Sequence, residues 1–412
     1  MDQKQIRKYA RLAVQTGVNL QPGQTAMIYV APDQYAFAEM VMEECYQAGA
    51  GHVMIEWTFQ PATRMAYIYE SLETLSKVPV WLEEKHKWMA EELPAHIHIL
   101  SDDPDGLAGL DADKMQKAIV ARNKILKKYR DLRENKDQWT IVAIPSPAWA
   151  AKVFPDLAEE EAMEALWKAI FSCVHISAEN DPVADWNQHN KNFLNRCDKL
   201  NGYAFERLEY HNGIGTDFTV ELIPGVLWAG GGEYSLQGIY YNPNMPTEEI
   251  FTSPMAGKCE GTLVASKPLS YQGRMIENFS VTFKNGKAVS WKAEKGEDVL
   301  ERIITMDEGS HMLGEIALVP ESSSVSRTGV MFYETLFDEN ASCHVALGAG
   351  FSNLLPGFEK MTMEEWHAAG INDSMTHVDF MVGTSDMKIT GVTKDGKRVD
   401  IFVDGEWSEE FA

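Results

Sequence analysis

The sequence has no apolar run long enough to cross a membrane and no pattern of paired cysteines. No stretch approaches the roughly 18 apolar residues of a spanning helix, and residues 1–18 form an amphipathic pattern without the apolar core of a signal peptide. The five cysteines are scattered, odd in number and never spaced C-x-x-C. We therefore expect a cytoplasmic protein that has neither a disulfide framework nor a structural zinc site.

Basic residues are scarce relative to acidic ones. Lys and Arg number 37 against 61 Asp and Glu, so the formal net charge at pH 7 is −24. A charge of this sign repels nucleic acid and anionic membranes, and we expect neither as a partner. The turn at residues 30–37 also lacks the G-x-G-x-x-G of a dinucleotide site.

The first part of the chain alternates strand and helix patterns. Apolar, β-rich runs at residues 25–32, 52–59 and 96–103 are separated by helix patterns. This alternation is typical of a doubly wound sheet made of β-α-β units. We predict an α/β N-terminal domain at residues 1–190, with helices at 4–17, 33–51, 61–75, 79–93, 111–137 and 157–174.

An Asn-rich connector at residues 176–203 leads into a helix, and strand patterns dominate beyond it. Asn285-Gly286 and Asp395-Gly396 are hairpin signals between such strands. We therefore predict a mixed α+β, largely antiparallel C-terminal domain at residues 191–412, and we expect this domain to bind metal. Two domains also suit a chain of 412 residues.

The stretch from Phe337 to Phe380 concentrates side chains that bind metals. His377 and Asp379 form an H-x-D, and residues i and i+2 of a strand point to the same face. Glu339 and His344 are five residues apart, which suits a loop or a helix edge. Their neighbours are apolar, where a charge is costly unless it is paired or bound to metal. An H-x-D is also a common surface pair, so the pattern alone leaves both interpretations open.

Two further acidic positions lie outside this stretch. Glu248 and Glu249 follow Pro246, and Glu315 interrupts an apolar strand pattern at residues 314–320. Helix capping and a solvent-facing strand edge are the ordinary alternatives for these groups. Four carboxylates and two imidazoles are nevertheless a suitable supply for two metal ions about 3.5–4 Å apart, and they come from Glu249, Glu315, Glu339, His344, His377 and Asp379.

Other candidates have simpler interpretations. We interpret His96 and His98 as core or strand-end residues, and the acidic loop that starts at Asp102 as either a ligand loop or an ordinary turn. Cys343 precedes His344, but adjacent residues of a strand point to opposite faces, which disfavours a Cys–His nucleophile pair.

The ordered set of motifs PTEEIFT, GEIALVP, DENASCHVALG and HVDF resembles the M29 metallo-aminopeptidases of the aminopeptidase T or S type. GTDFTVELIPGVLWAGG and GTSDMKITG extend the resemblance over essentially the whole chain. The resemblance implies release of amino acids from the amino ends of short peptides by two divalent cations, with zinc, cobalt and magnesium left open. It also implies a homodimer whose sites face an enclosed cavity.

The resemblance implies which residues act. Its ligand positions match Glu249, Glu315, Glu339, His344, His377 and Asp379, so that Glu249 is preferred over Glu248, and Glu315 is expected to be catalytic as a ligand or proton-transfer group. The family also has a catalytic tyrosine at a position that Phe351 occupies here. Because a phenyl ring donates no hydrogen bond to an oxyanion, the alternatives are a two-metal hydrolase of another substrate class and a metal-binding member with reduced activity.

Overall fold

The computed structural model describes residues 2–271 and 273–412, which form two compact units. The first unit runs from the amino terminus to Asn187 and includes Gly232–Pro246, and the second consists of Gln188–Gly231 and Thr247–Ala412. The chain is mixed α/β, with one parallel sheet and otherwise antiparallel sheets. The domain limits at residues 190 and 191 stay a prediction, since compactness alone does not prove independent folding.

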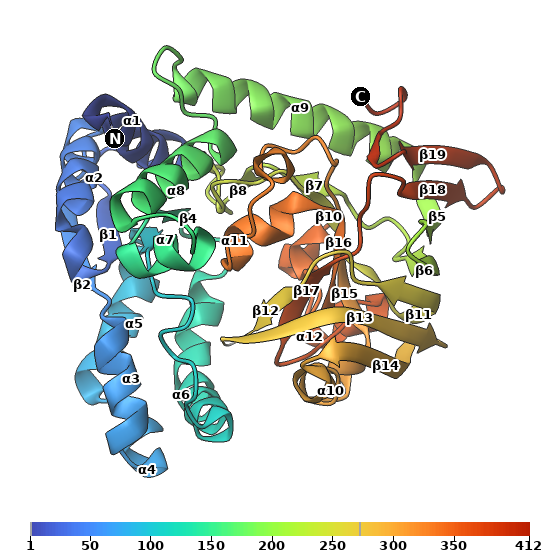
Figure 1. Cartoon of the computed structure of the whole chain (residues 1–412), viewed down its shortest axis with the longest axis horizontal. Coiled ribbons are helices and arrows are strands. Elements are labelled where there is room, and N and C mark those ends of the chain that lie inside the picture. Colours follow the sequence, from blue (N-terminus) through green and yellow to red (C-terminus); the bar gives the residue numbers. More distant parts are fainter. Residues whose placement is uncertain (1, 272) are drawn as a thin grey trace. The chain divides into compact units, whose positions relative to one another are not determined.

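The first unit is built on the parallel sheet, whose strand order is β2-β1-β3-β4. The apolar residues of strand β1 are buried, and Ala26, Ile28 and Val30 have no exposed surface. Strands of a parallel sheet that is covered on both faces are typically apolar throughout. The three strand patterns predicted for this part of the chain are confirmed. The strands are β1 (Thr25–Val30), β2 (His52–Trp57), β3 (Ala95–Leu100) and β4 (Trp139–Ala143) (Figure 1).

The helices of the first unit follow the predicted pattern with two corrections. The helix expected at residues 61–75 breaks at Glu70, whose backbone is extended, and Ser71 caps a new helix by accepting the Thr74 N–H. A helix that was not predicted, α7, follows β4, because Ser146 caps its first turn. The helices are α1 (Gln3–Leu12), α2 (Tyr35–Gln47), α3 (Gln60–Tyr69), α4 (Leu72–Leu75), α5 (Val80–Glu92), α6 (Ala112–Arg133), α7 (Pro147–Val153) and α8 (Glu159–Cys173).

The segment Gly232–Pro246 joins the edge of the parallel sheet. It forms the hairpin of β8 (Glu233–Tyr234) and β9 (Tyr240–Tyr241) and then runs beside β4. The Ile141 N–H donates to the Pro243 carbonyl at 2.7 Å, and the Met245 N–H donates to the Ile141 carbonyl at 3.0 Å. These bonds fix the backbone of the segment that immediately precedes Glu248 and Glu249.

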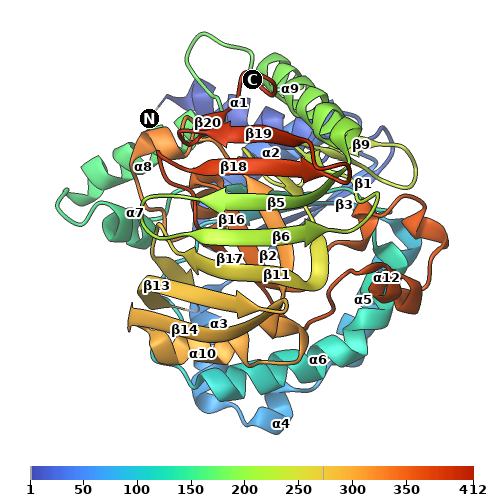
Figure 2. The ribbon, with the colours of Figure 1, turned by 90° about the vertical axis from the view of Figure 1, so that its right-hand side faces the viewer.

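The second unit contains a long antiparallel sheet, which Figure 2 shows from one side. Its strand order is β12-β13-β11-β6-β5-β18-β19-β20, and β14 also pairs with β13. The hairpins predicted at Asn285-Gly286 and Asp395-Gly396 are confirmed as the turns of β13-β14 and β18-β19. The strands are β5 (Phe205–His211), β6 (Asp217–Leu222), β11 (Pro254–Val264), β12 (Leu269–Tyr271), β13 (Arg274–Lys284), β14 (Lys287–Lys295), β18 (Lys388–Thr393), β19 (Arg398–Val403) and β20 (Glu406–Trp407).

A second antiparallel sheet has the order β17-β16-β15-β10-β7. Its strands are β7 (Ala229–Gly230), β10 (Ile250–Thr252), β15 (Leu313–Leu318), β16 (His344–Gly348) and β17 (His377–Met381). The remaining helices are α9 (Pro182–Tyr203), which spans the boundary of the two units in the sequence, α10 (Glu297–Ile304), α11 (Thr335–Asp338) and α12 (Met363–Ala369). Of the helices formed by the described residues, none combines the length and the apolar character needed to cross a membrane.

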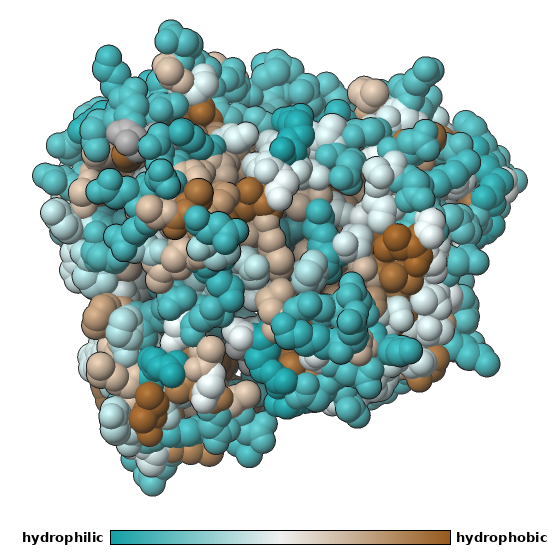
Figure 3. Space-filling view, in the orientation of Figure 1, coloured by the Kyte–Doolittle hydropathy of each residue, from teal (hydrophilic) through white to brown (hydrophobic). Residues whose placement is uncertain are grey.

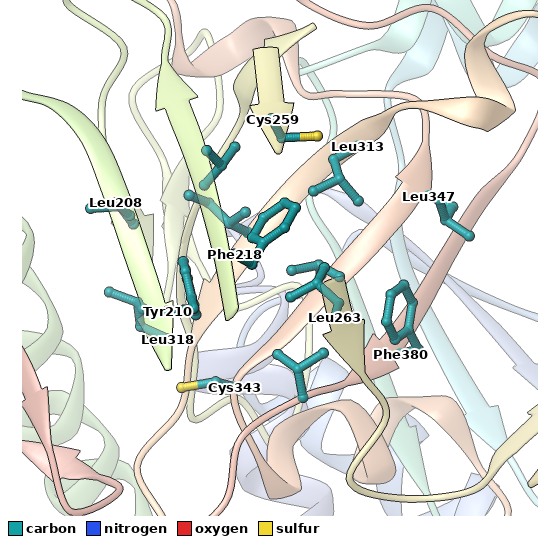
Figure 4. Close-up of a cluster of buried hydrophobic side chains, with 14 of the residues drawn as sticks. Leu208, Tyr210, Phe218, Cys259, Leu263, Leu313, Leu318, Cys343, Leu347 and Phe380 are labelled. Carbon is teal, nitrogen blue, oxygen red and sulfur yellow. The ribbon is translucent and has the colours of Figure 1, made fainter. Parts of the chain in front are cut away.

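The two sheets of the second unit share one apolar core (Figure 4). Tyr210 and Phe218 of the long sheet are buried with Leu318, Leu347 and Phe380 of the five-stranded sheet. Because side chains alternate along a strand, the face of the five-stranded sheet that is turned away from this core carries the intervening residues. Those residues include four of the candidate metal ligands, Glu315, His344, His377 and Asp379.

Candidate metal centre

Strands β15, β16 and β17 place the candidate ligands in register on one face of the sheet. Glu315 lies opposite Ala346, and Ala346 lies opposite Asp379. Residues directly opposite one another in an antiparallel sheet share a face, so the two carboxylates flank a single methyl group. A larger side chain at residue 346 would fill the space between them.

Glycines allow the backbone to approach closely at the end of this face. Gly314 lies in the bulge before Glu315, and a Cβ atom there would come within 2.1 Å of the Ala349 carbonyl oxygen. Gly348 has a φ of +111°, and a Cβ atom there would lie 2.0 Å from the Thr376 carbonyl oxygen. The glycines of the GEIALVP and HVALG motifs are therefore required by packing beside the ligands.

The structure brings five of the six predicted ligands into two groups. Glu249, Glu315 and His344 form the first group, and Glu315, His377 and Asp379 form the second. Within each group the candidate ligand atoms all lie within 4.8 Å of one another. Glu315 belongs to both groups, which is the position of a carboxylate that links two neighbouring sites.

Both imidazoles are oriented by backbone carbonyl groups. His344 Nδ1 lies 3.2 Å from the Ser342 carbonyl oxygen, and His377 Nδ1 lies 2.8 Å from the Ala349 carbonyl oxygen. A carbonyl only accepts, so Nδ1 donates and Nε2 faces the carboxylates, at 3.0 Å from Glu249 and 3.0 Å from Glu315 respectively. Histidines that bind metals are held in this way.

A buried asparagine holds the backbone next to the carbonyl group that orients His377. The Asn372 side chain donates to the Gly348 carbonyl at 2.5 Å and to the Gly309 carbonyl at 2.8 Å. The Ala349 N–H, next in the chain, donates to the Thr376 carbonyl at 2.8 Å. No sequence pattern indicates this role of Asn372, because only the folded chain shows which backbone groups its amide reaches.

Glu339 lies at the edge of the cluster. It begins a short 3-10 turn, Glu339–Ala341, and is half-buried. Burial and the negative charges of Glu249 and Asp379 raise its pKa, so its carboxyl group is close to theirs. Glu339 and Asp379 also line a small cavity of about 20 Å³, which has room for about one water molecule.

The electrostatics of the cluster call for positive charge. Burial opposes ionisation of both imidazoles, but the carboxylates around them outweigh it and raise the pKa of His344 to about 10 and that of His377 to about 12. Burial also raises the pKa of Glu315 to about 7. Without metal, the two protonated imidazoles therefore offset part of the negative charge of the carboxylates. A bound cation would take over that role.

The donor set fits divalent metal ions. Four carboxylates carry four negative charges when they are ionised, and two divalent cations would balance them with neutral imidazoles. Asp379 Oδ1 is buried and makes no hydrogen bond of good geometry, although His377 Nε2 lies 3.3 Å away. An acceptor of this kind suits a cation, because a buried carboxylate is costly unless it is paired or bound to metal.

Comparison with known proteins places the chain in a family. The family model described as "Thermophilic metalloprotease (M29)" matches residues 2–407. Aminopeptidase AmpS of Bacillus subtilis (strain 168) is 40% identical over 98% of this chain and 98% of its own length. Aminopeptidase 2 of Geobacillus stearothermophilus is 40% identical over 100% of this chain and 99% of its own length.

The likeness extends to a solved structure, wild-type AmpT from Thermus thermophilus. Its TM-score is 0.90 at 36% sequence identity, with 98% of this chain and 99% of that chain covered. The chain belongs to the M29 family. The family predicted from the ordered motifs is confirmed, and so is the expectation of a metal-dependent aminopeptidase, which is a hydrolase and an exopeptidase.

The other candidates of this M29 chain have structural partners. The Glu248 carboxylate accepts the Ser324 N–H at 3.1 Å, whereas Glu249 faces His344. His96 Nε2 lies 3.1 Å from an Asp137 carboxylate oxygen within the first unit, as befits a core residue. Burial raises the pKa of the Cys343 thiol to about 12, so this group is no nucleophile at neutral pH.

Phe351 lies beside the candidate ligands. Its ring centroid is 5.1 Å from that of His377 and 5.3 Å from that of Phe251. Phe351, which the motif resemblance matches to the family's tyrosine, is thus next to the cluster and has no hydroxyl group to donate.

The histidine environment predicts that metal uptake depends on pH. The pKa values of about 10 for His344 and about 12 for His377 mean that both are protonated at neutral pH without metal. A ligating Nε2 must lose its proton, so affinity should rise with pH by up to about tenfold per pH unit for each proton released. Calorimetric titration with zinc or cobalt between pH 6 and 8, in buffers of different ionisation enthalpy, measures the affinity and the protons.

The exposed His367 supplies the control for this titration. His367→Ala should keep the pH dependence, whereas His344→Ala should reduce the number of protons released. An affinity that does not change with pH would show that metal binding does not remove protons from these two imidazoles.

Proposed function

We propose that the chain releases single amino acids from the amino ends of short peptides by means of two divalent cations. The observation that carries the proposal is the pair of ligand groups that share Glu315 on one sheet face, in a chain of a metalloprotease family. The names of the relatives, which are aminopeptidases at 37–40% identity, support release from the amino end.

We assign one cation to Glu249 and His344 and the other to His377 and Asp379, with Glu315 shared between them. Glu339, at the edge of the cluster, completes the set. The mixture of imidazole and carboxylate suits zinc or cobalt, and magnesium is the third choice because it prefers oxygen. All six residues belong to the second unit, which supports a catalytic domain at residues 191–412 and an α/β domain at residues 1–190.

The side chains of the cluster suggest how hydrolysis proceeds. When bound, the two cations would polarise the peptide carbonyl and make water more acidic. Glu315 would serve either as a ligand of both cations or as the group that takes the proton from the attacking water and passes it to the leaving amine. The carbonyl groups of Ser342 and Ala349 keep His344 and His377 fixed during the reaction.

A second candidate function is the same reaction at a strongly reduced rate. It is favoured by Phe351, which lies next to His377 but cannot donate a hydrogen bond. Loss of one oxyanion donor costs about 10²–10³ in rate. A two-metal hydrolase of another substrate class has no comparable support, since the relatives are named as aminopeptidases.

We further propose that the chain works in the cytoplasm. All five cysteines are free and buried, which suits a reducing compartment.

A homodimer is also proposed, on the evidence of an apolar surface in the first unit. Helix α3 buries none of its side chains, and Met65, Ile68 and Tyr69 follow one another at helical spacing with 58%, 49% and 83% exposure. Trp81, in the first turn of α5, is 65% exposed. Figure 3 shows apolar atoms in the lower left, where Figure 1 places α3 and α4. Exposed apolar surface of this kind marks contact sites.

The activity prediction concerns Glu315. The metal-loaded protein should release the first residue of dipeptides and amino acid amides, and a chelator should stop it. Glu315→Gln keeps the shape but loses the charge, so kcat should fall at least about 10³-fold. Glu359→Gln, at an exposed glutamate, should leave kcat unchanged.

Three outcomes of this assay are informative. No release with zinc, cobalt, manganese or magnesium would refute the proposed function. Near-zero release that rises sharply in Phe351→Tyr would favour the second candidate. Full activity of Glu315→Gln would show that another group transfers the proton.

The ligand prediction concerns metal content. His344→Ala and Asp379→Ala should each lower it by at least one ion per chain, as measured by elemental analysis after dialysis, because each removes a donor from a different group. His367→Ala and Glu359→Gln, both at exposed residues, are the matched controls. Unchanged stoichiometry in the first two variants, or loss of metal in either control, would contradict the assignment.

The dimer prediction concerns Tyr69 and Trp81. A stable interface buries about 1,200–2,000 Å², so a buried, unpaired carboxylate at its centre should dissociate it. Light scattering should give twice the chain mass for the unaltered protein and a lower mass for Tyr69→Glu with Trp81→Glu. Leu157→Glu, at a leucine that is 44% exposed elsewhere in the first unit, should not change the mass, and a monomeric unaltered protein would refute the dimer.

A further inference from the structure

Two aromatic rings lie on the sheet face that carries the ligands. Phe251 on β10 is opposite Ala317 on β15, and Ala317 is opposite His344 on β16. Opposite residues share a face, so the Phe251 ring is on the same face as the His344 imidazole. Phe351 follows β16 by three residues, and its ring packs between the Phe251 and His377 rings at 5.3 and 5.1 Å.

These two rings are held in place but are not fully covered. Both residues are half-buried and pack against the core of the second unit. The Phe351 N–H donates to Ser253 Oγ at 2.8 Å, and Ser253 itself is completely buried. The rings of Phe251 and Phe351, which we name the aromatic shelf, therefore present rigid apolar surface beside a candidate metal ligand.

The opposite end of β17 leads to a small cavity. Past His377, the strand continues to Asp379 and Met381, which line the small cavity with Glu339. This cavity has a volume of about 20 Å³, enough for about one water molecule and too little for an amino-acid side chain. Of the two ends of β17, the shelf end is the one that presents apolar ring surface beside a candidate ligand.

The chemistry of the shelf selects among side chains. The two phenyl rings offer no hydrogen bond and no charge, so a carboxylate or amide placed on them would lose water without gaining a partner. An apolar side chain gains from leaving water, by an amount that grows with its area. Glycine gains nothing, because it has no side chain to cover the rings.

We propose that Phe251 and Phe351 form the subsite for the side chain of the peptide's first residue, so that the chain prefers leucine, methionine and phenylalanine to aspartate and glycine. The inference rests on the proposed function, because it needs the peptide's first carbonyl at the metal cluster. It adds the residues that determine specificity and the class of first residue that they accept.

A panel of amino-acid p-nitroanilides tests this subsite. The unaltered, metal-loaded protein should show a kcat/KM for the leucyl compound at least about tenfold above that for the glycyl and aspartyl compounds. Phe351→Ala and Phe251→Ala should each lower the leucyl-to-glycyl ratio several-fold. Phe358→Ala removes a half-buried ring that packs against the same core and should leave the ratio unchanged.

A variant that places a positive charge in the subsite distinguishes a changed side-chain preference from loss of folding. Phe351→Lys should raise the aspartyl-to-leucyl ratio above that of the unaltered protein, which a misfolded variant cannot do. Thermal unfolding and metal content identify variants that have lost the site itself.

The outcomes separate this inference from the proposed function. If the panel is hydrolysed but the ratios do not move in Phe251→Ala, Phe351→Ala or Phe351→Lys, the subsite lies elsewhere and the aminopeptidase proposal stands. If no p-nitroanilide or dipeptide is hydrolysed with any metal, the proposed function is refuted, and so is the subsite that depends on it. If the ratios move as expected, both are supported.

Discussion

Four carboxylates gathered at one face of a sheet repel one another, and the rest of the site follows from how that repulsion is relieved. Glu249, Glu315 and Asp379 are joined by Glu339 at the edge, and burial of these groups makes their negative charge costly. In the absence of metal, His344 and His377 hold protons and offset part of the charge. The cluster is therefore suited to bind cations, and the raised pKa values of the two imidazoles reflect the excess of negative charge around them.

The rigidity of the cluster comes from groups that never touch a metal. Carbonyl groups of Ser342 and Ala349 fix the two imidazoles, and Asn372 fixes the strand end from which Ala349 projects. Gly314 and Gly348 let the strands approach closely enough for these bonds. Positions of this kind are essential for preorganisation, because a ligand that must be reoriented on binding weakens the affinity for metal.

The fold was predicted from the sequence where local patterns are strong. The alternation of strands and helices up to residue 174 and the two Gly-containing hairpins are confirmed, since hydrophobic period and turn chemistry are local properties. The break at Glu70 and helix α7 were missed, because Ser71 and Ser146 act as caps in a context that periodicity does not reveal. The return of Gly232–Pro246 to the first sheet depends on backbone bonds between distant segments, which no local signal encodes.

The sequence by itself determined the family, the supply of carboxylates and imidazoles, and the apolar alternation that turns His377 and Asp379 to one side of a strand. Tertiary structure alone decided that Glu315 belongs to both ligand groups, that Glu249 rather than Glu248 faces His344, and that Phe251 and Phe351 lie beside them. The physical reason is sheet register: pairing of β10, β15, β16 and β17 aligns residues that are more than 100 positions apart in the chain. Register is set by the whole core, whereas a motif records only its own neighbours.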